Sequence, residues 1–100
     1  MAVPSTDYAA VAASQTDQIL GTTGHVGDIL QRMVLSVATA ATSTVSIKDG
    51  NGSAIPVLAA NAPVGVYWIN IGARCKNATT PGWKVTTGAG VSVFAVGRFT

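Results

Sequence analysis

Short β-prone runs, each followed by a turn signal, are the feature that most constrains the fold of this chain. The runs are rich in β-branched and aromatic residues, and glycine, proline, asparagine or aspartate separates them. They cover residues 29–37, 44–48, 54–58, 66–73, 83–86 and 91–96. Runs that recur roughly every eight to fifteen residues are typical of antiparallel sandwiches and barrels. The sequence therefore predicts an all-β domain, a small antiparallel β-sandwich or barrel of about six to eight short strands.

Alternation of apolar and polar residues indicates which side of each strand faces the core. Across residues 29–37 the side chains of Met33, Leu35 and Val37 share one face, while Arg32 takes the other. The alternation of this run is imperfect. Residues 44–48 alternate cleanly, so we expect their apolar members to point inward.

Two turn signals predict how neighbouring strands connect. Residues 49–52 read Asp-Gly-Asn-Gly, which supplies residues that accept positive φ, and they predict a turn between two strands. In the strand that follows, Pro56 cannot donate a ladder hydrogen bond, which predicts a sheet edge or a bulge. Residues 88–90 read Gly-Ala-Gly and predict a closing hairpin between strands 83–86 and 91–96.

The first 27 residues differ in composition from the rest of the chain. They are rich in alanine, serine, threonine and glutamine, and residues 8–13 could support one or two turns of helix at most. Terminal segments of this kind are commonly mobile unless contacts hold them. We therefore expect residues 1–27 to form an extended N-terminal arm and residues 28–100 to form the β-sandwich domain.

Composition favours a protein that is buried in an assembly. Only 10% of the residues are charged and glutamate is absent, so the surface is unusually apolar for a free monomer. The basic residues are spread along the chain at a net charge of +2, which argues against a nucleic-acid partner. No apolar run is long enough to cross a membrane, and the N-terminus does not resemble a secretory signal. We expect a protein made in a cytoplasm, with no membrane association.

Few residues of this chain are of the types that build a catalytic or metal-binding site. His25, Asp28 and Cys75 are the types that build a nucleophilic site, but no local signature brings them together. One histidine and one cysteine are too few for a zinc site within one chain. We expect no catalytic site, no metal and no cofactor, with His25 at the surface of a glycine-rich loop. Because Arg74 and Lys76 flank Cys75 and favour its thiolate, cross-linking to another subunit is the alternative to a free thiol beside a loop.

Four aromatic residues, Tyr67, Trp68, Trp83 and Phe94, could form a platform for a sugar or a single-stranded base. Tyr67 and Trp68 point to opposite faces of their strand, so they cannot belong to one platform. We interpret the aromatic residues as core, with a subunit interface as the next alternative.

Two longer stretches resemble known proteins. Residues 45–55 read VSIKDGNGSAI and residues 82–93 read GWKVTTGAGVSV, after a glycine-rich lead-in at residues 21–27. This pattern resembles small virion-associated proteins of tailed bacteriophages, of the kind found among head proteins. The resemblance implies a capsid decoration (cement) protein, or a component of a head fibre or spike.

A decoration protein of this kind binds the outside of the major capsid shell, often as a homotrimer, after synthesis in the host bacterial cytoplasm. The resemblance therefore implies a non-enzymatic virion protein on the capsid exterior, whose partner is the major capsid protein. The alternative is a receptor- or glycan-binding module of a head fibre, spike or tail fibre. If the arm reaches a neighbouring capsomer, we expect its contacts to be made by Tyr8, Val11, Ile19, Leu20, His25, Val26 and Ile29.

Overall fold

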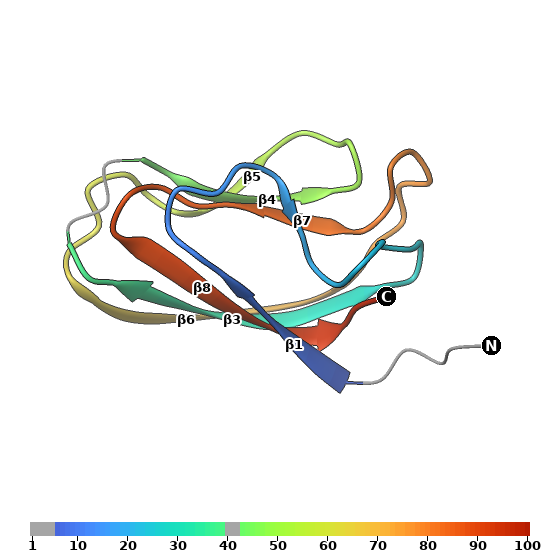
Figure 1. Ribbon diagram of the computed structural model, residues 1–100, viewed down its shortest axis with the longest axis horizontal. Helices are drawn as coiled ribbons and strands as arrows, with labels where there is room; N and C mark the ends of the chain where they lie inside the picture. The colour runs from blue at the N-terminus through green and yellow to red at the C-terminus, as the bar shows by residue number, and fades with distance from the viewer. Residues whose placement is uncertain (1–5, 40–42) are drawn as a thin grey trace.

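In the part of the chain that the structure describes, eight strands form two four-stranded antiparallel sheets that face one another as two layers (Figure 1). The structure is a computed structural model that describes residues 6–39 and 43–100. The strands are β1 (Thr6–Val11), β2 (Gln18–Ile19), β3 (Ile29–Val37), β4 (Val45–Asp49), β5 (Ile55–Leu58), β6 (Gly65–Arg74), β7 (Trp83–Thr86) and β8 (Val91–Arg98). Sheet A has the order β1-β8-β3-β6 and sheet B the order β2-β7-β4-β5. The predicted all-β fold is confirmed, as a sandwich rather than a closed barrel.

The core lies between the two sheets and follows the predicted alternation. Met33 and Leu35 of β3 are completely buried, and Val45 and Val85 meet them from sheet B with no exposed surface. Fully burying one such side chain contributes roughly 1.5–3 kcal/mol to folding. Within the described residues no helix occurs that could cross a membrane.

A bulge explains why residues 29–37 alternate imperfectly. The register of β3 shifts between Leu30 and Arg32 against both of its neighbours, β6 and β8. Gln31 and Arg32 are therefore both exposed, between the buried Leu30 and Met33. The extra residue directs the Arg32 side chain away from the core.

The turn at residues 49–52 and the position of Pro56 are as predicted. Strands β4 and β5 pair antiparallel across this turn, in which Gly50 has a φ of 59°. Strand β5 is an edge of sheet B, and its pairing with β4 is irregular next to Ser46 and Pro56. Both reasons for tolerating a proline in a strand are met here.

The predicted closing hairpin is wrong, because β7 and β8 belong to different sheets. Strand β7 pairs with β2 and β4 in sheet B, whereas β8 pairs with β1 and β3 in sheet A. Residues 87–90 cross from one layer to the other, and Gly90 turns the chain with a φ of 80°. Trp83 and Val85 thus face Val91 and Val93 across the core instead of lying beside them.

Residues 6–27 are integrated into the sandwich, which corrects the expectation of an arm over this range. Strand β1 pairs with β8 along six residues, and β2 pairs with β7 along two. Residues 8–11 form strand rather than helix, because Ala9 and Val11 face the core while Tyr8 and Ala10 face outward. The predicted boundary between residues 27 and 28 is therefore not a structural one, and residues 1–5 of the predicted arm lie outside the described residues.

Candidate functional site: the outer face of sheet A

Large apolar side chains are exposed on the side of sheet A that faces away from the core. Trp68 is 71% exposed, Tyr8 66%, Val66 59% and Phe94 43%. Scattered single apolar residues are normal at a protein surface, but a contiguous group on one sheet face marks an interaction site. We call this surface the aromatic face.

The strand registers place these side chains beside one another. Phe94 of β8 lies opposite Val34 of β3, and Val34 lies opposite Trp68 of β6, so the three form one row across the sheet. Tyr8 of β1 completes the group, because its ring stacks on Phe94 with 5.0 Å between centroids and 17° between planes. Offset stacking at this distance is favourable for aromatic pairs.

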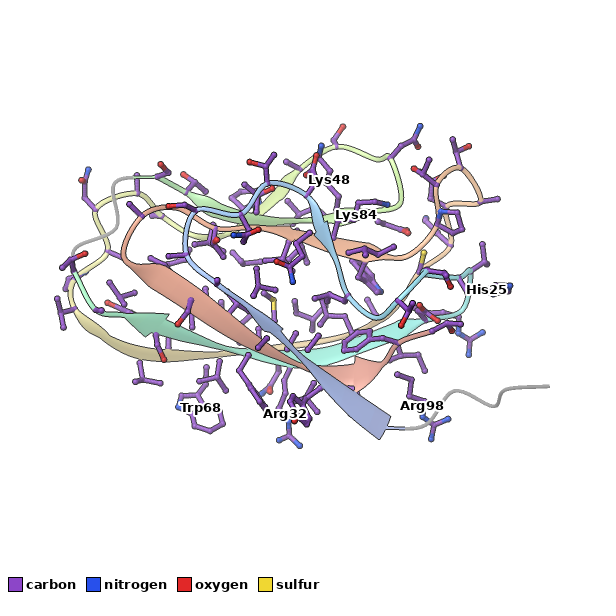
Figure 2. The ribbon with its side chains drawn as sticks, in the orientation of Figure 1. His25, Arg32, Lys48, Trp68, Lys84 and Arg98 are labelled. Atoms are coloured by element: carbon purple, nitrogen blue, oxygen red, sulfur yellow. The ribbon has the colours of Figure 1, made fainter. Side chains whose placement is uncertain are left out.

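Three arginines lie among these apolar groups or at their border. Arg32 sits in the row next to the aromatic one, between Val96 of β8 and Asn70 of β6. Arg74 and Arg98 are exposed at the ends of their strands on the same face. Figure 2 shows Trp68, Arg32 and Arg98 projecting from sheet A to the same side. Among the described side chains on this face, the charged ones are those of Arg32, Arg74 and Arg98.

The outer face of sheet B has a different character. Lys48 forms an ion pair with Asp17 at 3.1 Å, and the Thr86 hydroxyl donates to the same carboxylate. The hydrogen bond from Lys48 holds the pKa of Asp17 below its usual value. Lys84 donates to the carbonyl oxygens of Thr80 and Gly50. Polar groups on this face bind one another.

The structure does not bring the predicted contact residues together. Val11 and Leu20 are 1% and 0% exposed, so both belong to the core, which corrects their assignment as contacts. Ile19 and Ile29 are half-buried. Tyr8 lies on the aromatic face.

The other two predicted contacts, His25 and Val26, are exposed on the loop between β2 and β3. Figure 2 shows His25 at one end of the molecule, away from Trp68. The described contact residues therefore do not form one surface.

The aromatic residues divide between core and surface. Trp83 is 4% exposed and its Nε1–H donates to the Asp28 carbonyl oxygen at 3.2 Å, as expected for core. Trp68 and Phe94 are exposed, so the interpretation of these two as core is wrong. Alternation showed that Tyr67 and Trp68 point to opposite faces, but both faces of β6 are apolar. The pattern alone could not indicate which face is covered.

Asp28 has a structural arrangement rather than a catalytic one. Its buried carboxylate accepts hydrogen bonds from the main-chain N–H groups of His25 and Thr100, and from the Thr100 hydroxyl. The His25 ring is exposed, and its Nδ1 lies 2.8 Å from the Val26 carbonyl oxygen. Asp28 therefore orients loop main chain and not an imidazole.

Cys75 is enclosed instead of being available beside a loop. Its side chain is fully buried and its Sγ accepts the Gly82 N–H at 3.1 Å. Burial raises the pKa of the Cys75 thiol, and the carboxylate of Asp49 adds to the effect. The flanking cations do not produce the thiolate that the sequence suggested, and the buried sulfur is not placed for a cross-link between subunits.

Among the histidine, cysteine and aspartate side chains that the structure describes, no three lie close enough together to hold a metal ion. Comparisons with protein-family models, with curated proteins and with solved structures find no match to this chain. The aromatic face is therefore the feature on which a functional proposal rests.

Proposed function

We propose that this chain is a non-enzymatic capsid decoration protein of a tailed phage, which binds and stabilises the major capsid shell through its aromatic face. The observation that carries the proposal is the row of exposed Phe94, half-buried Val34 and exposed Trp68, with Arg32 in the next row. Tryptophan, tyrosine and arginine are the residues that most often dominate protein–protein binding energy. The resemblance of residues 45–55 and 82–93 to phage head proteins supports the choice of partner.

The chemistry of the face defines the surface that it fits. Its apolar row needs an apolar patch on the capsid, and its arginines need carboxylates around that patch. Arginine suits such a contact because its planar guanidinium binds a carboxylate through two parallel hydrogen bonds. Contacts repeated over a capsid lattice stabilise the shell even when a single contact is weak.

The test compares binding of two variants to expanded heads that lack this protein. Trp68→Ser removes the most exposed aromatic side chain of the face, and Ile55→Ser removes a side chain of sheet B that is 46% exposed. We expect Trp68→Ser to weaken cosedimentation with heads at least tenfold, which is a loss of about 1.4 kcal/mol. Ile55→Ser should bind as the unchanged chain does. Full binding by Trp68→Ser would contradict docking through the aromatic face.

The second candidate function is a glycan- or receptor-binding module of a head fibre, spike or tail fibre. The stacked rings of Tyr8 and Phe94 and the exposed Trp68 favour it, because sugars stack on exposed aromatic rings. This function predicts that the isolated chain binds host polysaccharide and that particles carry few copies. Decoration predicts no such affinity and many copies spread over the shell.

A further inference from the structure

A hollow of about 250 Å³ lies on the outer face of sheet B, beside the turn at residues 49–52. We call it the lysine pocket, and it is lined by Asp17, Lys48, Gly50, Asn51, Thr80 and Lys84. Its two lysines come from neighbouring strands, β4 and β7, and lie directly opposite one another in the ladder. Figure 2 shows both on the opposite side of the sandwich from Arg32. Because like charges in opposite positions destabilise a strand pair, these two ammonium groups favour negative charge beside them.

The lining of the lysine pocket supplies one carboxylate for the two lysines. Asp17 lies 3.1 Å from Lys48 Nζ. The hydrogen bond from Lys48 lowers the pKa of Asp17 most, and the charge of Lys84 adds a smaller effect in the same direction. Lys84 itself donates to neutral acceptors, the carbonyl oxygens of Thr80 at 2.5 Å and of Gly50 at 3.3 Å. Two positive charges and one negative charge leave the lining with a net charge of +1.

Asp49 follows Lys48 in the sequence but does not neutralise this charge. Its carboxylate accepts hydrogen bonds from the main-chain N–H groups of Lys76 and Asn77. It also lines a different hollow, on the side of the turn where Ile55 is exposed. The positive charge of the lysine pocket is therefore available to a ligand.

Three side chains of the lysine pocket have N–H groups left to donate within the described part of the chain. An ammonium group has three N–H donors, of which Lys48 uses one and Lys84 uses two. Asn51 is exposed, and its Oδ1 accepts from Asn77 Nδ2 at 2.9 Å. This hydrogen bond assigns the Asn51 oxygen, so its Nδ2 group remains as a donor. Acceptor oxygens of a ligand would complete this set.

We propose that the lysine pocket binds a carboxylate group, held between Lys48 and Lys84 with Asn51 as a further donor. A carboxylate carries one negative charge and therefore balances the lining, whereas a phosphate monoester carries about −1.5 to −2 and would leave it negative beside Asp17. The volume of about 250 Å³ is small, which suits a single small acid or the end of a peptide rather than a larger ligand. Lysine is a point charge on a flexible stem, so the two ammonium groups can adjust to the oxygens that they meet.

This site goes beyond the proposed function and does not depend on it. The aromatic face belongs to sheet A, whereas the lysine pocket lies on sheet B. Loss of head binding in Trp68→Ser and loss of carboxylate binding in the variants below are therefore separate results.

Titration with acetate tests the site, with acetamide as the uncharged probe of the same shape. In ¹H–¹⁵N spectra at constant ionic strength, we expect acetate to shift the amide signals of Gly50 and Asn51 to a plateau, and acetamide to leave them in place. Lys48→Gln should raise the Kd for acetate about tenfold or more, and it leaves the hydrogen bonds of Lys84 to the loop intact. Lys76→Gln is the control, because it removes the same charge from an exposed side chain outside the lysine pocket. Shifts that do not saturate, or equal weakening by the two variants, would overturn the proposal.

Removal of the competing acid gives a test in the opposite direction. Asp17→Asn keeps the shape of the side chain, releases Lys48 and raises the charge of the lining by one. The ion pair is exposed and contributes at most about 1 kcal/mol, so this variant should fold. We expect it to bind acetate more tightly than the unchanged chain does. Unchanged or weaker binding would show that the two lysines do not hold the carboxylate.

N-acetylglycine distinguishes two sources of the carboxylate. It ends in the same group as acetate but adds a peptide unit before it. Tighter binding of N-acetylglycine than of acetate would assign the lysine pocket to the carboxylate of a peptide, and equal binding would assign it to a small free acid. Both results support a carboxylate site, whereas failure of both probes to saturate the Asn51 signal would overturn it.

Discussion

At the scale of single residues, the two tryptophans show how differently one residue type is used in this sandwich. Trp83 is 4% exposed and hydrogen-bonded, whereas Trp68 is 71% exposed on the aromatic face. We expect Trp83→Ala to lower the free energy of unfolding by about 3–5 kcal/mol, because it empties a core site. Trp68→Ala should change it by no more than about 0.5 kcal/mol. Urea unfolding of both variants measures the difference, and a similar loss for the two would contradict the assignment of faces.

The buried thiol of Cys75 makes the free energy of unfolding depend on pH. Because burial raises the pKa of the folded thiol above its ordinary value of 9.0, folded and unfolded states are both protonated below that pH, and stability is fully present there. As pH rises past 9.0, the unfolded thiol loses its proton first, so the free energy of unfolding falls. Urea unfolding at pH 8 and at pH 10 should show a larger fall for the unchanged chain than for Cys75→Ala. An identical fall in both would show that other groups cause it.

At the scale of elements, the sequence predicted strands better than it predicted their partners. All six runs became strands, and the turn at residues 49–52 joined the expected pair, because alternation and turn residues are local signals. The link between β7 and β8 was misread because a hairpin and a crossing between sheets share the same alternation and the same glycines. What separates them is whether the inward residues lie side by side or face one another across the core. That depends on β3 and β4, which are distant in sequence.

The candidate site was missed for a related reason. Sequence reasoning expected binding by residues 1–27, because their composition differs from that of a typical core segment. In the structure Val11 and Leu20 are core, and the exposed aromatic residues lie on β1, β6 and β8. A useful signal was present in residues 66–71, where the side chains that point to one side of the strand and those that point to the other are both mostly apolar. Such a strand either is covered on both sides or exposes an apolar face, and only packing decides between the two.

Removal of residues 1–20 tests the role of the first two strands. The deletion takes away β1 and β2 together with Val11 and Leu20, whose burial contributes roughly 1.5–3 kcal/mol each. It also uncovers β8 along one side. We expect the remaining chain to lose its cooperative thermal transition or to melt far below the full chain. An unchanged melting temperature would show that these residues are an arm after all.

At the scale of the whole molecule, the sandwich separates two kinds of outer surface. Sheet A carries exposed aromatic side chains and arginines, whereas sheet B carries lysines that bind neighbouring oxygens. The net charge of +2 hides this division. A partner that binds the outer face of sheet A should therefore lose affinity when a cation is removed from that face, and not when one is removed from sheet B.

The variants Arg32→Ala and Lys48→Ala each remove one positive charge, from opposite faces of the sandwich, so their binding to heads can be compared directly. Arg32→Ala removes the guanidinium next to the aromatic row, and Lys48→Ala removes the ion pair with Asp17 on the opposite face. The exposed ion pair contributes at most about 1 kcal/mol to stability, so both variants should fold. We expect Arg32→Ala to bind expanded heads more weakly than the unchanged chain at low salt. The difference in binding between Arg32→Ala and the unchanged chain should become smaller at high salt, because the screening length falls to ~3 Å at 1 M. Lys48→Ala should bind as the unchanged chain does at every salt concentration. Equal weakening of the two variants would mean that heads attract the chain through its overall charge, and docking by the aromatic face would lose its electrostatic support.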